Sequence, residues 1–200
     1  MTARPNILPD PRFSELRPFL ADRLAKVSAL LSAENFAALL DPLMADVIRR
    51  GFDDAGAHEG TVWLLDTAGQ ALVPAYNTGP NADRIVGKFR QPLNAGIICM
   101  VLASEQPFVE NEACQNSKHS KLLDSSLGVQ TYALIAVPFY LFNRCLGVVS
   151  CVQLKKPGSN EPAPPGFDPG DLKVIQRAVD HLTRLLEYRL LGATVGWSSE

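Results

Sequence analysis

The sequence lacks the residue groupings on which most enzymes and metal proteins depend. It has no G-x-S-x-G motif, no glycine-rich phosphate loop and no pair of carboxylates on one predicted helix. Its histidines, His58, His119 and His181, are far apart, and none has a Cys, Asp or His at metal-ligand spacing on the same element. We therefore predict no catalytic residues, no metal site and no cofactor, and we expect that the chain is not an enzyme.

The sequence also lacks an excess of charge of either sign. It has 19 Lys and Arg against 21 Asp and Glu, a formal net charge of −2, so we expect neither nucleic acid nor a membrane as a partner. The N-terminus has no apolar stretch typical of a signal peptide. The 4 cysteines have no C-x-x-C spacing and indicate buried free thiols. These features predict a cytoplasmic protein.

What the chain does have is a long, nearly uncharged segment over residues 129–154, with Arg144 as its one formal charge. Its β-branched residues and its internal Pro and Gly argue against the rival interpretation, a membrane-spanning helix. A two-residue turn at Asn143-Arg144 predicts a β-hairpin with strands near 131–142 and 145–155.

The predicted turn also fixes which residues of this hairpin face one another. It would place Phe139 opposite Val148, and Val137 opposite Ser150. Both faces of the hairpin would then be largely apolar. We therefore expect other elements to cover both faces, with the hairpin at the centre of a sheet.

The remaining elements are helices and short strands. The sequence predicts helices from Ser14, from Ser32 to Gly51 with an interruption at Pro42, over 95–105 after Asn94, near 119–127 before Gly128, and from Asp168 to about Leu191. It predicts strands over 61–66, 71–77, 88–93 and 106–111, with residues 53–60 as a loop. Hairpin-linked strands with helices segregated from them indicate an α+β fold with an antiparallel sheet.

The last helix carries two apolar stripes. The first has the alternating spacings of three and four that form a coiled-coil seam, at Leu172, Ile175, Val179, Leu182 and Leu186. The second lies beside it, at Val174, Ala178, His181, Leu185 and Tyr188. One stripe can cover the sheet, and we predict that the other, the seam, forms a homodimer interface. The alternative is a single wide face buried within the chain.

Four blocks in this order resemble the GAF domain, the small-molecule sensor family of phosphodiesterases, phytochromes and bacterial regulators: TVWLLDTAGQALVPAYNTG, RQPLNAGIICMVLASEQPFVENEA, LGVQTYALIAVPFYLFNRCLGVVSCVQL and FDPGDLKVIQRAVDHLTRLLE. The resemblance implies a central sheet of about six strands, with terminal helices on one face and crossing helices and loops on the other. It also implies three parts: an N-terminal extension and helix over 1–32, a domain with a C-terminal dimerisation helix over 33–191, and a short tail over 192–200.

The resemblance extends only in part to particular groups of the family. Members that bind cyclic nucleotides share Lys155, Phe167 and Asp171, but Leu154 and Leu172 replace their Asn and Glu. A cyclic nucleotide therefore stays one candidate ligand, with another flat heterocycle as the alternative.

Two further groups of the family fit less well. Members that attach a bilin have a Cys beside a His, where this chain has Lys118 and His119, with Cys114 nearby. Members that reduce free methionine sulfoxide use three cysteines. Cys99 lies near one of these positions, but the catalytic Cys before the central hairpin is missing.

We predict a ligand pocket over one face of the sheet, walled by the 78–94 loop and the 111–130 segment. The candidate ligand-binding residues are Trp63, Tyr76, Phe89, Cys99, Asn111, His119, Gln130 and Tyr132. The predicted function is sensory: a small molecule binds, and a homodimer signals to a separate effector protein. The alternatives are a dimerisation scaffold without a ligand and a thiol-based redox sensor or enzyme that uses Cys99.

Overall fold

A computed structural model describes residues 14–29, 31–158 and 162–196 of the chain. The expectations for the segment before Ser14 and for the last four residues lie outside the described residues. Six antiparallel strands form one sheet in the order β3-β2-β1-β6-β5-β4. They are β1 (Glu59–Leu65), β2 (Ala71–Asn77), β3 (Gln91–Pro92), β4 (Phe108–Glu110), β5 (Gln130–Leu141) and β6 (Arg144–Lys155). The predicted α+β fold with a six-stranded antiparallel sheet is confirmed.

The hairpin of β5 and β6 occupies the middle of the sheet, as predicted, but its turn lies one residue earlier. Phe142 and Asn143 form the turn with positive φ angles of 48° and 60°, which both central residues of a type I′ turn require. The predicted pairing is also wrong, because Val137 lies opposite Val149, not Ser150. The moved turn alone would change the pairing by two residues, but a bulge between the pairs Tyr140–Cys145 and Phe139–Gly147 makes the net slip one residue. A slip of one residue moves every side chain of a strand to the other face, so Ser150 belongs to the face opposite Val137.

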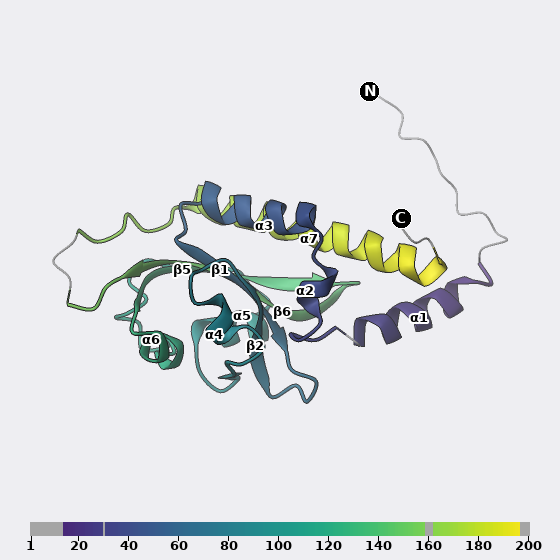
Figure 1. The fold of residues 1–200 in the computed structure, drawn as a ribbon, viewed down its shortest axis with the longest axis horizontal. Helices are drawn as coiled ribbons and strands as arrows, with labels where there is room; N and C mark the ends of the chain where they lie inside the picture. Colours follow the sequence, from purple (N-terminus) through teal and green to yellow (C-terminus); the bar gives the residue numbers. More distant parts are fainter. Residues whose placement is uncertain (1–13, 30, 159–161, 197–200) are drawn as a thin grey trace, which may run out of the picture.

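Helices cover both faces of this sheet. They are α1 (Arg17–Ala29), α2 (Phe36–Leu39), α3 (Pro42–Asp54), α4 (Ala82–Ile85), α5 (Ile97–Ser104), α6 (Leu122–Leu127) and α7 (Pro169–Val195). Figure 1 shows α3 and α7 side by side over one face, which we call the helical face, and α4, α5 and α6 on the other. α1 packs against α7 beyond the end of the sheet. The predicted division of helices between the two faces is confirmed.

α3 begins at the proline that interrupts the predicted second helix. The Asp41 side chain accepts a hydrogen bond of 2.9 Å from the Met44 backbone N–H, and Pro42 occupies the first turn. The prediction that Gly51 ends this helix is wrong. A Cβ at Gly51 would lie 2.3 Å from the Cβ of Ala178, so the glycine lies inside α3 because α7 passes too close for a side chain.

α7 begins as predicted and ends four residues later than predicted. Asp168 and Asp171 form a capping box at its start, and Gly196 ends it with a φ of 79°. The predicted dimer seam is wrong in its location. Ile175, Val179, Leu182 and Leu186 are buried in the core of the same chain, and Leu172 packs against that core half-buried. The alternative, a wide face buried within the chain, is the one that forms.

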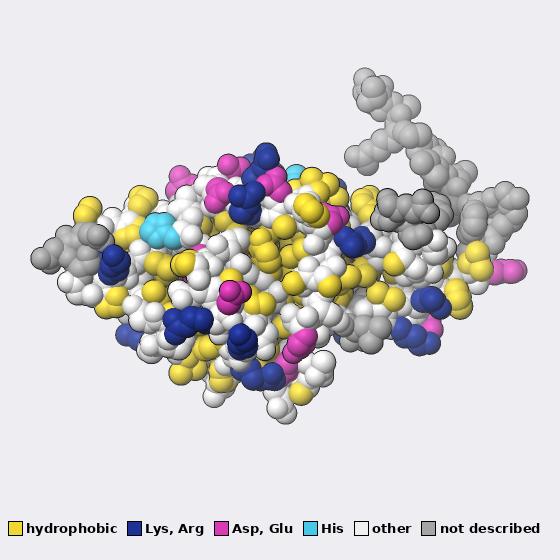
Figure 2. All heavy atoms as spheres, in the orientation of Figure 1, with side chains coloured by type: hydrophobic (Ala, Val, Ile, Leu, Met, Phe, Trp, Pro, Cys, Tyr) yellow, Lys and Arg dark blue, Asp and Glu magenta, His cyan; other side chains and the backbone are white. Residues whose placement is uncertain are grey.

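The surface is mixed in character, as the near-zero net charge indicates. Figure 2 shows basic and acidic side chains scattered among apolar and neutral ones over the visible face, without a large patch of one sign. The described helices include none with the length and hydropathy that a membrane span requires.

Candidate functional site

A cavity lies on the sheet face opposite α3 and α7, and we call this the cavity face. The space between its lining atoms is about 610 Å³ with the open mouth included, of which about 60 Å³ is open to the centres of water molecules. Its floor comes from three strands: Glu59, Thr61 and Trp63 of β1, Thr131 and Leu134 of β5, and Ser150, Val152 and Leu154 of β6. Its walls are the start of α5, the α6 segment and Gln91 of β3. The cavity is a narrow slot, suited to a compact small molecule.

The strand period of two explains which β1 residues reach the cavity. Glu59, Thr61 and Trp63 line it, while Val62 and Leu64 pack into the core of the helical face. β1 begins at Glu59, whereas the sequence predicted a loop as far as residue 60. Glu59 was missed for this reason, whereas Thr61 lay inside the predicted strand and was not chosen. Polar residues at every second position of a strand are the signal that finds both.

Trp63 belongs to the floor of the cavity. Its indole N–H donates a hydrogen bond of 2.9 Å to Ser150 Oγ, and its ring meets the Phe89 ring edge-on at 6.2 Å. The structure thus places the predicted residue Trp63 in the lining. Phe89 packs behind Trp63 and does not line the cavity.

Asp124 and its hydrogen-bonding partners form one side of the cavity. The carboxylate of Asp124 accepts hydrogen bonds of 2.8 Å from both the backbone N–H and the Oγ1 of Thr131, and lies 3.2 Å from His119 Nε2. Burial alone would raise the pKa of Asp124, but the hydrogen bonds from His119 and Thr131 outweigh it and lower that pKa below 3.8. Asp124 is therefore ionised at neutral pH, and the predicted residue His119 lines the cavity beside it.

A second carboxylate, that of Glu59, faces the same cavity without the support that Asp124 has. Glu59 is 8% exposed, and no hydrogen bond or ion pair joins its side chain to any residue that the structure describes. Burial and the nearby charge of Asp124 raise its pKa above 4.5. A Cβ at Gly79 would lie 1.8 Å from Glu59 Oε2, so the carboxylate passes directly over a glycine that leaves room for it.

Several predicted ligand-binding residues lie elsewhere. Tyr76 and Tyr132 pack against the core of the helical face, on the opposite side of the sheet. The Asn111 amide holds Phe167 through hydrogen bonds of 3.0 and 2.7 Å to its carbonyl and N–H, and so fixes the loop before α7. Gln130 pairs with Lys155 at the start of β5, outside the lining. Strand parity decides the side of the sheet on which the two tyrosines lie, and the sequence did not fix it.

Cys99 lies in the apolar core behind the cavity wall, on α5. The start of α5 is capped by Gly96 with a φ of 108°, not by Asn94 as predicted. The Cys99 thiol donates a hydrogen bond of 3.4 Å to the Pro92 carbonyl, and burial raises its pKa to about 11. Because the thiolate is the reactive form, Cys99 does not fit the role of nucleophile. All four cysteines are free, and the described residues hold no group of three metal-ligating side chains.

The fold and the cavity together define a class of protein. It is an α+β domain with a packed helical face and, on the other face of the same sheet, a cavity that can hold a small ligand. Residues 15–186 match the GAF domain family, and the chain belongs to that family. GAF domains are sensory and regulatory domains of many signalling proteins.

Solved structures show the same fold. A GAF domain of a phosphoenolpyruvate-protein phosphotransferase from Coxiella burnetii is 17% identical with a TM-score of 0.59, covering 90% of this chain and 96% of that one. A GAF domain/HD domain protein from Geobacter sulfurreducens is 16% identical with a TM-score of 0.58, covering 78% and 97%. The free methionine-R-sulfoxide reductase of Neisseria meningitidis is 20% identical with a TM-score of 0.51, covering 96% of both chains. Comparison with curated proteins finds no match.

Proposed function

We propose that this GAF domain is a sensor that binds a small molecule in the cavity between the sheet and the α5 and α6 segments. The observation that carries the proposal is the convergence of polar groups on an otherwise apolar slot. Glu59, Thr61, Asp124 and Ser150 meet there among side chains such as Trp63, Ile97 and Leu134. An apolar pocket with a few convergent polar groups is the usual form of a small-molecule site.

The charge of the lining favours one kind of candidate ligand over the other. No Lys or Arg is among the described residues that line the cavity, whereas Glu59 and Asp124 are both acidic. A cyclic nucleotide carries a phosphate, which needs cationic or N–H partners and is repelled by carboxylates. A flat heterocycle without a phosphate therefore suits the cavity better than a cyclic nucleotide.

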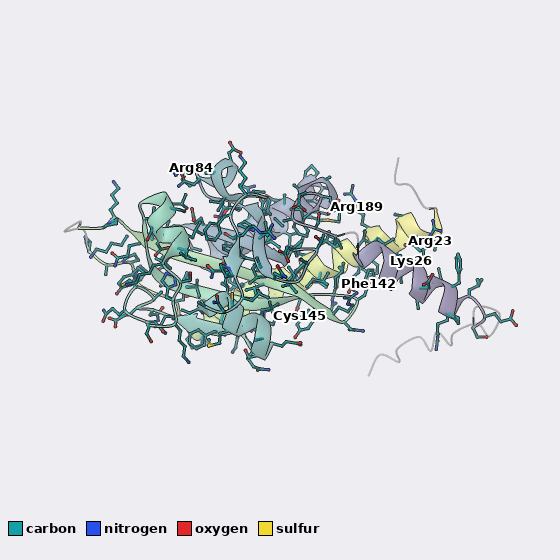
Figure 3. All side chains as sticks on the ribbon, turned by 90° about the horizontal axis from the view of Figure 1, so that it is seen from below. Arg23, Lys26, Arg84, Phe142, Cys145 and Arg189 are labelled. Carbon is teal, nitrogen blue, oxygen red and sulfur yellow. The ribbon has the colours of Figure 1, made fainter. Side chains whose placement is uncertain are left out.

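The central hairpin offers a route from the cavity to α7. Ser150 and Val152 of β6 line the cavity, while their neighbours Val149 and Cys151 pack under the helices. At the hairpin tip, which Figure 3 shows beside α7 at Phe142, the Phe142 N–H donates a hydrogen bond of 2.6 Å to the Glu187 carboxylate of α7. A ligand that prefers one position of the hairpin would bias α7 and, through it, an effector.

The expected homodimer has another surface available now that the seam is buried. Figure 1 shows α1 and the end of α7 beyond the edge of the sheet. Tyr188 of α7 is 71% exposed, and Phe19 of α1 is 60% exposed. We propose that these apolar side chains form the interface with a second copy. Light scattering on a Tyr188→Glu variant tests this: a chain mass of 21.7 kDa is expected in place of twice that value, and an unchanged dimer would refute the location.

A pair of matched variants tests the ligand site. Val152 lines the cavity and Val174 lines a groove between α3 and α7, and both are half-buried. In a thermal-shift screen of nucleobases, nucleotides, amines and amino acids, a compound that stabilises the wild type should lose its effect on Val152→Phe and keep it on Val174→Phe. The scaffold alternative is favoured if no compound stabilises the wild type, or if Val152→Phe changes nothing.

A further inference from the structure

The two carboxylates of the cavity are held in different ways, and the difference points to a missing partner. Asp124 has three hydrogen-bonding contacts, with both groups of Thr131 and with His119. Glu59 has none within the described chain, although it is more than nine-tenths buried. A largely buried carboxylate without a partner is costly, because it has lost most of its water contacts and gained no hydrogen bond in return.

The oxygens of Glu59 reach the cavity. Glu59 is among the residues that line it, and no side-chain oxygen or nitrogen in the described chain is both fully enclosed and unpaired. Gly79 adds to this arrangement, since any side chain there would occupy the position of Glu59 Oε2. The carboxylate is thus buried against protein on one side and directed toward open space on the other.

The surroundings of the two acids leave a place for a positive charge. His119 is the one basic side chain among the described residues that line the cavity, and it already contacts Asp124. A metal ion would need a cluster of at least three ligating side chains, which the described residues do not provide. An organic cation needs less: a few acceptor oxygens for its N–H groups and an apolar surface for the rest of the molecule.

We propose that the ligand of the cavity is a small organic cation, whose protonated amine lies between Glu59 and Asp124 and whose apolar part lies against Trp63 and Leu134. This inference rests on the proposed function, because it names the ligand class for the same cavity. Glu59 and Asp124 supply the charge, and the apolar walls exclude water and strengthen the charged hydrogen bonds. The slot limits the ligand to a compact molecule.

Two pairs of isosteric compounds test the charge directly. n-Butylammonium is compared with n-butanol, and benzylammonium with benzyl alcohol, by isothermal titration calorimetry on the full chain at neutral pH. In each pair the shape is nearly constant while the charge differs. The amine is expected to bind about tenfold more tightly than the alcohol, since a charged hydrogen bond exceeds a neutral one by roughly that factor.

Glu59→Gln keeps the shape of the side chain and removes its charge. It should reduce the preference for the amine, since only the charge of Asp124 remains, and leave the affinity for the alcohol unchanged, whereas Glu112→Gln, at an exposed acid outside the lining, should keep the full preference. Should Glu59→Gln fold poorly, Thr131→Val, which removes one hydrogen bond to Asp124, is expected to reduce the preference in part.

Three outcomes would overturn the inference, and they separate it from the proposed function. Equal binding of amine and alcohol, with both lost in Val152→Phe, leaves the cavity as a ligand site and refutes the cation. A preference of undiminished size in Glu59→Gln refutes the role of Glu59. If neither compound binds and the wider screen with Val152→Phe also finds no ligand, the proposed function fails together with the inference.

Discussion

The two faces of the sheet differ in what they bury. The helical face buries a continuous apolar core that includes Phe139, Ile175 and Leu182. Most buried polar side chains of the described chain lie on the cavity face or beside it: Glu59, Thr61, Asn77, Gln91, Asp124, Thr131 and Ser150, with Gln153 as the exception. Buried polar groups cost stability unless they are paired. The contrast therefore separates a face that contributes stability from a face at which we propose that a ligand binds.

The largest expected effect comes from a cavity made in the helical core. Leu182→Ala removes a fully buried side chain and should lower the free energy of unfolding by about 3 kcal/mol. Leu123→Ala, at the half-buried wall of the cavity, should lower it by only about 1 kcal/mol. Urea denaturation followed by circular dichroism measures both. Equal losses would show that the two faces do not differ in their contribution to stability.

The next effect concerns the close approach of α3 and α7. Gly51→Ala places a methyl group against Ala178, where no room exists, and should cost about 2 kcal/mol through overpacking. Adding Ala178→Gly in the same chain makes room for the methyl group and should restore part of the lost stability. The recovery is incomplete because glycine inside a helix is itself less stable than alanine by about 1 kcal/mol. Additive losses in the double variant would contradict a direct contact between these positions.

On the cavity face, one substitution should stabilise the protein. Glu59→Gln removes a desolvated charge near Asp124 and is expected to raise the free energy of unfolding by about 1 kcal/mol at neutral pH. Because the folded pKa of Glu59 is raised above 4.5, the wild type pays no penalty below that pH and loses stability as pH rises through the folded pKa. The advantage of Glu59→Gln should therefore grow from pH 4 to pH 7. A constant or shrinking difference would contradict the raised pKa.

The smallest effect is expected between the two short helices near the cavity. Arg84 of α4 donates a hydrogen bond of 3.1 Å to the Ser126 carbonyl of α6 at the surface. Figure 3 shows Arg84 well away from Phe142 at the hairpin tip. Arg84→Ala should change global stability by no more than about 0.5 kcal/mol. Hydrogen exchange of the α6 amides should nevertheless become faster, and unchanged exchange would show that this contact does not hold α6.

The sequence predicted the fold more fully than the site, and the hairpin shows why. Its apolar content and its turn residues indicated a central β-hairpin covered on both faces, which the structure confirms. The turn lies at Phe142-Asn143, one residue from the predicted place. A bulge between the pairs Tyr140–Cys145 and Phe139–Gly147, which the sequence did not predict, then reverses the faces of β6. Apolar content tolerates such a slip, whereas a pocket residue is defined by the face to which it points.

Two further predictions were wrong because they depend on contacts between distant parts of the chain, which local sequence patterns do not reveal. Gly51 resembles a helix end in sequence, but the partner that requires it, Ala178, is more than a hundred residues away. The seam of α7 has the spacing of a coiled coil, yet its partner is the sheet of the same chain. An apolar stripe specifies that it will be buried and does not specify by what.

The difference between the two faces is tested most directly by mapping where a small cation binds. Benzylammonium is titrated into ¹⁵N-labelled protein, and amide and indole chemical shifts are followed. We expect the largest changes at the Thr131 and Gly79 amides and the Trp63 indole N–H, which lie beside Asp124, Glu59 and the cavity floor, and their loss in Val152→Phe. Shifts concentrated on α3 and α7, with those three signals unmoved, would contradict the assignment of the cavity face as the binding face.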